Sequence, residues 1–187
     1  MRVVILGPNG SGKGTQAKLL TDELRVPHIS TGELFRAVVR AATPVGLAAK
    51  AKVQAGELVP DELVLTILGD RLDEPDAARG YILDGYPRTL DQAVALDRLL
   101  ADSGRTLDRA IELTVPDEVI LERCRIRYAE QHRADDDPEV VRGRLALYRK
   151  HIPAIVDRYA SRDVLTTIDG TGEPAAVFDR VLGALPN

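Results

Sequence analysis

Short apolar runs alternate along this chain with longer segments in which apolar residues recur every three or four positions. Short runs rich in β-branched residues are typical of buried strands, and the longer spacing is typical of helices with one buried face. The pattern predicts five strands, at residues 3–6, 27–30, 81–83, 110–115 and 164–168. Strands that alternate with helices in this way predict an α/β fold with three layers, in which a five-stranded parallel sheet lies between two layers of helices.

Helix starts are marked by proline and acidic residues, which are typical of the first helical turn. This chemistry occurs at Pro60, Pro116 and Pro138. Apolar spacing predicts further helices around residues 17–24, after Ser30, at residues 43–55 and 89–101, and around residues 178–185. Residues 75–80 are predicted as a loop, and residues 128–137, which lack apolar periodicity, as a short exposed flap.

A glycine-rich stretch directly follows the first strand and precedes the first helix. It reads Gly-Pro-Asn-Gly-Ser-Gly-Lys-Gly-Thr from Gly7 to Thr15. Glycines let successive backbone N–H groups turn toward one anion, the following helix points its positive end there, and Lys13 adds a full charge. Gly14 stands where a magnesium-binding hydroxyl is usual, and Thr15 is one residue late. The stretch predicts a nucleoside triphosphate site rather than an ordinary glycine-rich turn.

A second informative stretch, Asp84-Gly85-Tyr86-Pro87-Arg88, follows the strand at residues 81–83. An aspartate at this place in a phosphate-loop protein is expected to organise magnesium, here through water; the alternative is that it only caps the turn. Gly85 permits a ligand to approach the backbone closely, and Pro87 fixes the loop in a peptide bond that is a candidate for the cis form. Arg88 then lies at a strand's carboxyl end, where open α/β sheets bind ligands.

Composition limits the class of protein. The chain has 187 residues, of which 44% are hydrophobic, which suits one domain with a substantial core. No apolar run is long enough for a membrane span, there is no signal peptide, and the single cysteine, Cys124, excludes a disulfide within the chain, so we expect a cytoplasmic protein that does not enter a membrane.

Most of the basic residues are arginines, and many of these lie close together in the sequence. The net charge is −4, which gives no overall field that favours nucleic acid. There are 20 arginines against 5 lysines, and seven of those arginines lie between residues 123 and 149. Because the guanidinium fork suits bidentate phosphate recognition, this cluster is a candidate phosphate-binding set, with a solvated helix face as the alternative.

Four stretches, in this order, resemble the adenylate kinase family across essentially the whole chain. They are residues 7–16, residues 30–36, residues 56–61, and residues 84–89 together with Gln92. The resemblance implies reversible transfer of the terminal phosphoryl group of MgATP to AMP, giving two ADP. It also implies one phosphate-loop kinase domain over residues 1–187, with an AMP-binding lobe at residues 30–59 and a short lid at about residues 126–137 that closes over ATP.

The resemblance also implies roles for individual residues. For ATP it implies Gly10, Ser11, Gly12, Lys13, Gly14, Thr15, Arg127 and Gly172, the last near the adenine. For AMP it implies Thr31, Arg36, Glu57, Leu58, Val59, Gly85, Tyr86, Pro87, Arg88, Gln92, Arg133 and Arg144. For catalysis it implies Lys13, Asp84, Arg88, Arg123, Arg133 and Arg144, with Mg²⁺ held by phosphates and water near Asp84 and by no direct protein ligand.

The acceptor in such a reaction is a phosphate oxygen that is already anionic, so no general base is needed, and the chain shows no catalytic His or Ser arrangement. The predicted flap contains no cysteine, so we expect no four-thiolate zinc site. The expected partners are ATP and AMP or ADP, without nucleic acid, and the expected state is a monomer.

Three other functions fit the sequence less well. A UMP/CMP kinase shares the fold and most of the arginines, but usually has alanine at the place of Thr31, whose hydroxyl suits an adenine edge. A GTPase-type switch needs an Asn-Lys-x-Asp motif, and the only asparagines are Asn9 and Asn187. An arginine-rich nucleic-acid binder conflicts with the net charge and with an aromatic content of 4%.

Overall fold

The computed structural model describes residues 1–41, 60–131 and 136–186 of the chain. The described strands are β1 (Arg2–Leu6), β2 (His28–Ser30), β3 (Tyr81–Asp84), β4 (Arg109–Thr114) and β5 (Leu165–Asp169). The described helices are α1 (Lys13–Leu24), α2 (Thr31–Arg40), α4 (Asp61–Leu72), α5 (Leu90–Asp102), α6 (Asp117–Gln131), α7 (Pro138–Ala160) and α8 (Pro174–Gly183). The helix predicted at residues 43–55 lies outside the described residues.

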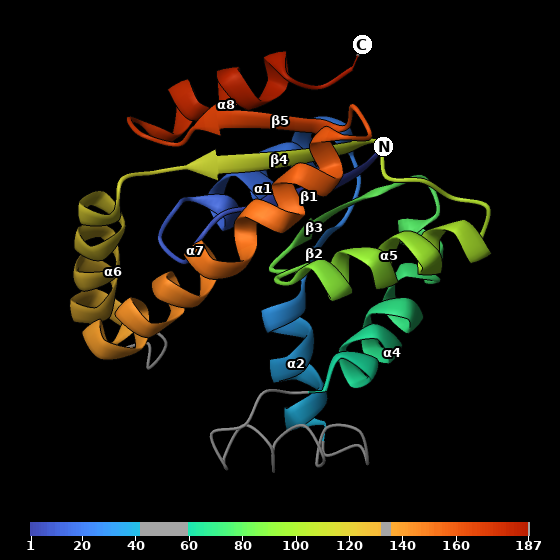
Figure 1. Ribbon diagram of the computed structural model, residues 1–187, viewed down its shortest axis with the longest axis horizontal. Coiled ribbons are helices and arrows are strands. Elements are labelled where there is room, and N and C mark those ends of the chain that lie inside the picture. Colours follow the sequence, from blue (N-terminus) through green and yellow to red (C-terminus); the bar gives the residue numbers. More distant parts are fainter. Residues whose placement is uncertain (42–59, 132–135, 187) are drawn as a thin grey trace.

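The five strands form one parallel sheet in the order β2-β3-β1-β4-β5, which confirms the predicted fold class. The chain runs from β1 to the edge strand β2, returns to β3 beside β1, and then crosses to the other side of β1 for β4 and β5 (Figure 1). β1 is therefore the point at which the winding direction changes. Ligands in open α/β sheets bind in the crevice outside the carboxyl ends of the strands at such a point, and the glycine-rich loop begins there.

Side chains of β1 alternate between two cores, as the twofold period of a strand requires. Val3 and Ile5 pack in a core with α1 and α8, whereas Val4 and Leu6 pack in a second core with α4, α5 and α7. All four side chains are buried, which explains the continuous apolar run in a strand covered on both faces. Figure 1 shows the resulting layers, with α5 and α7 on one side of the sheet and α8 on the other.

Several helix starts follow the predicted chemistry. The Asp137 carboxylate caps α7 by accepting hydrogen bonds from the backbone N–H groups of Glu139 and Val140. The Thr89 side chain caps α5 by accepting from the N–H of Gln92. Pro60 directly precedes α4, whose first turn carries two acidic residues.

The flap prediction was wrong for residues 128–131, which continue α6 as far as Gln131. Ala129, Glu130 and Gln131 are good helix formers, and a helical turn with no buried face leaves no periodicity to detect. Asp136, predicted within the same exposed flap, has no exposed surface. The predicted loop at residues 75–80 likewise contains a 3-10 turn at Pro75–Ala77.

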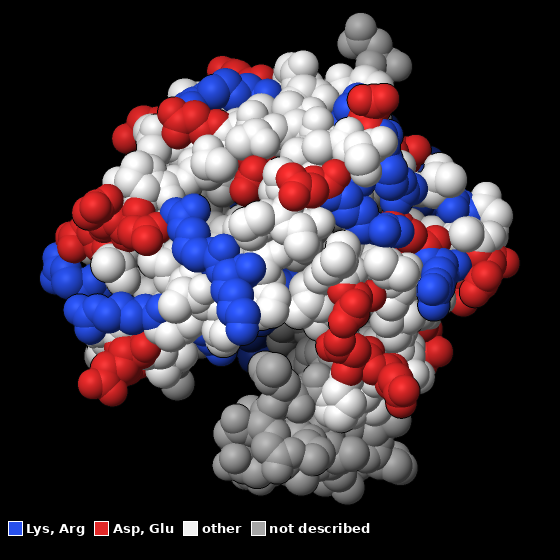
Figure 2. All heavy atoms as spheres, viewed as in Figure 1, with Lys and Arg blue, Asp and Glu red and all other residues white. Residues whose placement is uncertain are grey.

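Charges of both signs are interspersed over the face shown in Figure 2. Blue side chains gather in a run over the region of α7, a helix whose sequence carries five basic residues. None of the described helices combines the length and the apolar character needed to cross a membrane.

Asp97 joins α5 to Arg158 on α7 and to Arg162 in the turn that follows α7, and we expect its removal to destabilise the fold. Its Oδ2 lies 2.6 Å from a nitrogen of Arg158, and its Oδ1 lies 2.6 Å from a nitrogen of Arg162. The Asp97 side chain is 12% exposed, whereas the two arginines are 30% and 35% exposed, so solvent screens part of the interaction. Asp97→Ala should lower the free energy of unfolding by about 1–2 kcal/mol, measured by urea denaturation.

The matched control is Glu122→Ala, which removes the exposed partner of Arg125 on α6. We expect the control to leave the urea midpoint unchanged. An Asp97→Ala midpoint equal to that of the unaltered protein would show that the α5–α7 ion pairs do not hold these helices together.

Candidate functional site

The glycine-rich loop ends at an uncapped helix N-terminus. Gly12, the residue that precedes α1, has φ +96° and makes no side-chain cap hydrogen bond. Gly7 and Gly10 also have positive φ, at +150° and +85°. The first N–H groups of a helix have no partner within it, so this start offers donors to an anion, together with the positive end of the helix dipole.

The loop packs closely against α6 at Gly10, where a side chain is excluded. A Cβ on Gly10 would lie 2.8 Å from Sγ of Cys124 and 3.0 Å from the carbonyl of Ile120, both on α6. Ser11 is buried, and its Oγ has no hydrogen-bond partner among the described residues. A buried hydroxyl that lacks a partner, beside the uncapped start of α1, fits a site that is completed by a polar ligand.

Lys13 is enclosed by this loop, and its Nζ donates a hydrogen bond of 2.9 Å to the carbonyl of Pro8. Burial lowers the pKa of Lys13 to about 8. The Asp84 carboxylate acts in the opposite direction, and the Arg88 and Arg127 guanidinium groups act in the same direction as burial. Added positive charge near Lys13 is therefore unfavourable, and added negative charge is favourable.

Asp84 ends β3 beside the loop, 14% exposed in its side chain, with Oδ2 lying 3.4 Å from Nε2 of His28. Burial alone would raise the pKa of Asp84. The nearby His28 ring and the charges of Lys13 and Arg88 outweigh burial, so the pKa lies below its ordinary value. A Cβ on Gly14 would lie 3.8 Å from the same Oδ2. An ionised carboxylate therefore faces the start of α1.

Gly85 lies where no larger residue fits. Its φ is +86°, and a Cβ there would lie 2.8 Å from Oγ1 of the buried Thr31. The Tyr86–Pro87 peptide bond is cis, and both residues are buried, so the Tyr86 side chain belongs to the core. The geometry brings Thr31, Gly85 and Arg88 together at the carboxyl end of β3.

Arg88 and Gln92 are joined to each other. Nε of Arg88 donates to the carbonyl of Gly85 at 2.8 Å, and the N–H of Arg88 donates to Oε1 of Gln92 at 2.7 Å. Nε2 of Gln92 in turn donates to Asp61, the first residue of α4, at 2.7 Å. Desolvation and the nearby Arg144 guanidinium lower the pKa of Arg88, and Asp84 opposes them. α7, which carries Arg144, packs in the same core as Tyr86 of this loop, through Ile152 and Ile155.

The arginines of α6 lie on the other side of the loop. Arg123 donates to the carbonyls of Gly10 and Ser11, at 3.4 and 3.5 Å, and to that of Gly170 at 3.2 Å. Arg127, one turn later, forms a bidentate pair with Asp136, with both nitrogen–oxygen distances at 2.5 Å. Arg123 therefore bridges two loops, and Arg127 is held by a buried carboxylate.

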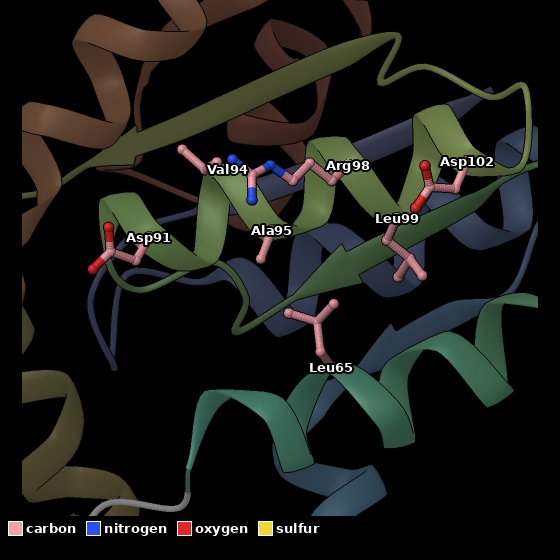
Figure 3. A pocket seen from close by; sticks show the side chains of 7 residues that line it. All are labelled: Leu65, Asp91, Val94, Ala95, Arg98, Leu99 and Asp102. Atoms are coloured by element: carbon pink, nitrogen blue, oxygen red, sulfur yellow. The ribbon is translucent and has the colours of Figure 1, made fainter.

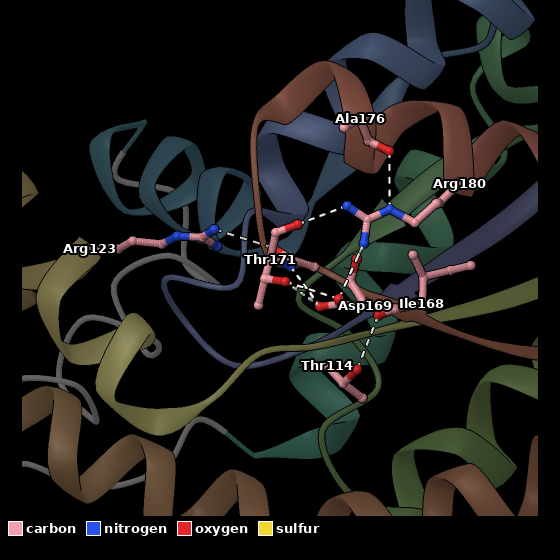
Figure 4. A network of polar contacts seen from close by, with 8 residues as sticks. Thr114, Arg123, Ile168, Asp169, Thr171, Ala176 and Arg180 are labelled. Carbon is pink, nitrogen blue, oxygen red and sulfur yellow. Dashed lines mark hydrogen bonds and ion pairs between the residues drawn. The ribbon is translucent and has the colours of Figure 1, made fainter.

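The turn after β5 completes this side of the site (Figure 4). The carboxylate of Asp169 accepts hydrogen bonds from the N–H and the hydroxyl of Thr171, at 2.9 and 2.8 Å. Gly172 has φ +95°, a conformation that favours glycine. The N–H of Gly170 donates to the carbonyl of Thr114 at 2.9 Å, so the turn is anchored to the end of β4.

The structure thus brings most predicted residues to one edge of the sheet. Arg36, on α2, instead lines a hollow of about 390 Å³ beside β2, together with Arg40 and Arg71. The predicted residues Glu57, Leu58, Val59 and Arg133 lie outside the described residues.

Another hollow, of about 420 Å³, lies between α4 and α5 and contains none of the predicted site residues (Figure 3). Its lining is mixed, with apolar side chains, one arginine and two aspartates: Leu65, Val94, Ala95, Leu99, Arg98, Asp91 and Asp102. This balance of charge does not favour a polyanion.

The described residues contain no group of three His, Cys, Asp or Glu side chains placed to hold a metal ion. The ionised Asp84 beside Gly14 fits a metal that is held mainly by a ligand's phosphates and by water, with the carboxylate as an outer partner.

Sequence analysis missed three contributors: His28, Asp136 and Arg180. His28 lies two residues before the end of β2, and the parallel pairing of Ser30 with Asp84 brings it beside the aspartate. Asp136 belongs to a run of three aspartates, which is typical of an exposed segment. Arg180 binds the turn at residues 169–172 from α8. Each acts through a contact between distant elements, for which no local pattern exists.

Known proteins are similar to this sequence over most of its length. A model of the adenylate kinase family matches residues 5–164. The chain is 49% identical over 185 residues to a protein named adenylate kinase from Stenotrophomonas maltophilia strain K279a, covering 99% of each chain. It is 48% identical over 169 residues to the protein of that name from Cyanothece sp. strain PCC 7425, covering 90% of this chain and 87% of the other.

The protein named adenylate kinase from Nocardia farcinica strain IFM 10152 is 46% identical over 185 residues, covering 99% of each chain. Since the family model and these relatives span nearly the whole sequence, this chain belongs to the adenylate kinase family.

Proposed function

We propose that this protein catalyses the reversible transfer of the terminal phosphoryl group of ATP to AMP, giving two ADP, as an ATP:AMP phosphotransferase. The observation that carries the proposal is the gathering of Lys13, Arg88, Arg123 and Arg127 around the glycine-rich loop, with Asp84 as the carboxylate among them. Two polyanions repel each other in water, and a centre of this kind offsets that repulsion.

The donor triphosphate lies on the loop formed by Gly10, Ser11, Gly12, Lys13, Gly14 and Thr15. The unpaired amides at the start of α1 and the buried Ser11 hydroxyl support this assignment. Arg127 contributes charge to the phosphates, and Gly172 lies near the adenine. Arg123 adds a cation beside the loop, which it already contacts through the carbonyls of Gly10 and Ser11.

The acceptor AMP lies on the opposite side, between β3 and the lobe at residues 30–59. Thr31, Arg36 and Gln92 bind it with Arg88, and the backbone at Gly85, Tyr86 and Pro87 approaches it closely. The predicted contacts of Glu57, Leu58 and Val59 with the base, and of Arg133 and Arg144 with the phosphates, complete this assignment.

Transfer proceeds by direct in-line attack. An oxygen of the AMP phosphate forms a bond to the γ-phosphorus, and the bond from that phosphorus to the bridging oxygen of ATP breaks, leaving ADP. The acceptor oxygen is already anionic, so Lys13, Arg88 and Arg144 act through position and charge. Mg²⁺ neutralises phosphate charge when bound, with Asp84 orienting its water. A short lid at about residues 126–137 excludes water, which would compete as acceptor.

We also infer a monomeric, cytoplasmic enzyme. The single cysteine is buried on α6, and the exposed large apolar side chains among the described residues are scattered over three helices: Leu90, Ile126, Tyr128, Val140 and Leu147.

A coupled assay of ADP formation tests the function. With ATP as donor, AMP should be the preferred acceptor over CMP, UMP and GMP, because the Thr31 hydroxyl suits an adenine edge. Preference for CMP or UMP would favour the alternative, a UMP/CMP kinase of the same fold. The absence of turnover with every monophosphate would refute the phosphotransferase assignment.

Replacement of Arg88 tests the charge-stabilising role. Arg88→Ala should lower kcat by about 10²–10³-fold, the range found when one preorganised donor to a developing charge is removed. The circular dichroism spectrum and the thermal midpoint should stay close to those of the unaltered protein, because Arg88 lies outside the hydrophobic cores and its Nε bonds only the Gly85 carbonyl. Arg98→Ala, an exposed arginine on α5, is the control and should keep normal activity. Near-normal turnover of Arg88→Ala would eliminate the role assigned to it.

The low pKa of Lys13 predicts proton uptake when ATP binds. In the free protein at pH 8 the ammonium is about half protonated, and a bound polyanion restores the charged form, so binding should take up about half a proton. Below pH 7 Lys13 is charged in both the free and the ATP-bound protein and contributes nothing to proton uptake. Above pH 8 the affinity for ATP should fall as pH rises. Titration calorimetry in buffers of different ionisation enthalpy measures the uptake.

Lys13→Arg keeps a permanent charge and serves as the control, with no uptake from residue 13 at pH 8. Equal proton uptake by Lys13→Arg and the unaltered protein would assign the proton to another group.

A further inference from the structure

Arg180, on α8, makes three hydrogen bonds to backbone carbonyls around the turn that follows β5 (Figure 4). One terminal nitrogen donates to the carbonyl of Asp169 at 2.6 Å, and the other donates to that of Thr171 at 2.8 Å. Nε donates to the carbonyl of Ala176 within α8 at 3.1 Å, which fixes the guanidinium on its own helix. One planar group therefore ties the end of β5, the turn and α8 together.

The turn depends on such ties because of its own composition. Gly170 and Gly172 give residues 169–172 the backbone freedom of two glycines in four positions, and ordering glycine costs more entropy than ordering any other residue. A Cβ on Gly170 would lie 2.8 Å from Val115 and 3.3 Å from the carbonyl of Ser11, so glycine is needed there to fit against the phosphate-binding loop. Close packing requires glycine at this position, so contacts from outside the turn must restrain its backbone.

Two groups restrain the turn besides Arg180. The Asp169 carboxylate holds the N–H and hydroxyl of Thr171, and Oδ2 also lies 3.4 Å from a nitrogen of Arg180. Arg123 donates to the carbonyl of Gly170 from the opposite side, as Figure 4 shows. A Cβ on Gly172 would lie 3.6 Å from the guanidinium of Arg180, which places Arg180 directly beside the residue proposed to lie near the adenine.

We propose that Arg180 is a positioning residue for the base of the donor nucleotide, because it holds the turn at residues 169–172 in the conformation that receives the base. The proposal rests on the proposed function, in which Gly172 lies near the adenine of ATP. Arg180 contacts the turn and does not act on the reacting atoms. Its effect is to remove, before ATP arrives, the entropy cost of ordering the turn.

The base and the phosphates of the donor therefore depend on different residues. The phosphates bind the loop that precedes α1, whose own bonds do not include Arg180. Loss of Arg180 should weaken the binding of a nucleotide and leave unchanged the binding of a triphosphate that lacks a base. AMP binding, on the far side of β3, should also be unchanged.

The test compares Arg180→Met with the unaltered protein. Calorimetric Kd for ATP should rise about tenfold, the effect of one charged hydrogen bond, whereas Kd for inorganic tripolyphosphate should change less than about twofold. In the coupled assay, KM for ATP should rise by a similar factor, with KM for AMP and kcat within about threefold of normal. Arg180→Lys, whose ammonium cannot span two carbonyls in the same plane, should give an intermediate rise.

Arg158→Met is the matched control, since it removes a partly buried arginine of α7 that pairs with Asp97 in a different part of the fold. It should lower the thermal midpoint without changing the ratio of the two KM values. If Arg180→Met does not fold, the same two Kd values are measured for Arg180→Lys, and a selective loss of ATP affinity is again required.

Equal losses for ATP and tripolyphosphate, or equal changes in KM for ATP and AMP, would overturn the proposal, because Arg180 would then support only the fold. Failure of the proposed function looks different. In that case the unaltered protein would show no AMP-dependent turnover, while the comparison of ATP with tripolyphosphate would still decide the role of Arg180.

Discussion

The arrangement at the carboxyl edge of the sheet depends on one electrostatic constraint, which is that several positive side chains must stay close together before a polyanion arrives. Repulsion between them grows where water is excluded. At Lys13, burial is the main cause of a pKa lowered to about 8, and repulsion from the nearby Arg88 and Arg127 adds to it. The protein offsets much of this with backbone carbonyls, that of Pro8 for Lys13 and that of Gly85 for Arg88. A carbonyl dipole stabilises a cation without neutralising it, so the positive potential remains available to phosphates.

The fold is close to what the sequence pattern predicts. Buried parallel strands read as continuous apolar runs, and β1, with Val3 to Leu6 buried on both faces, is the clearest case. The glycine-rich loop was recognisable because the chemistry of anion binding is local, since donors, glycines and Lys13 all come from neighbouring positions. The resemblance to adenylate kinases added the order of the motifs, and the family comparison agrees with it.

What could not be predicted depends on contacts between distant segments. The exposed end of α6 has no buried face, so helix formers such as Ala129 and Glu130 looked like a flap. Asp136 lies among aspartates that resemble a solvated run, and only the fold shows that it is buried against Arg127. The partnership of His28 with Asp84 follows from the register of β2 on β3, which apolar patterns do not specify beyond the choice of face. For Asp136 and His28, the sequence gives the identity of the side chain but not its partner.

Arg123 shows how these long-range contacts shape the two sides of the site. Its guanidinium bonds the carbonyls of Gly10 and Gly170, so the phosphate loop and the turn after β5 are restrained against each other. The bonds that Arg123 makes end on backbone groups, which cannot rotate away as a side chain can. Arg88 also bonds a backbone carbonyl, that of Gly85, but its connection to α4 runs through the Gln92 amide, which accepts from the N–H of Arg88 and donates to Asp61. Because a side-chain amide can exchange both bonds without moving the backbone, the Arg88 side is the more adjustable of the two. Under the proposed function, the donor would lie on the side that Arg123 restrains and the acceptor on the Arg88 side, an arrangement that suits a reaction in which the two phosphates must be aligned after both have bound.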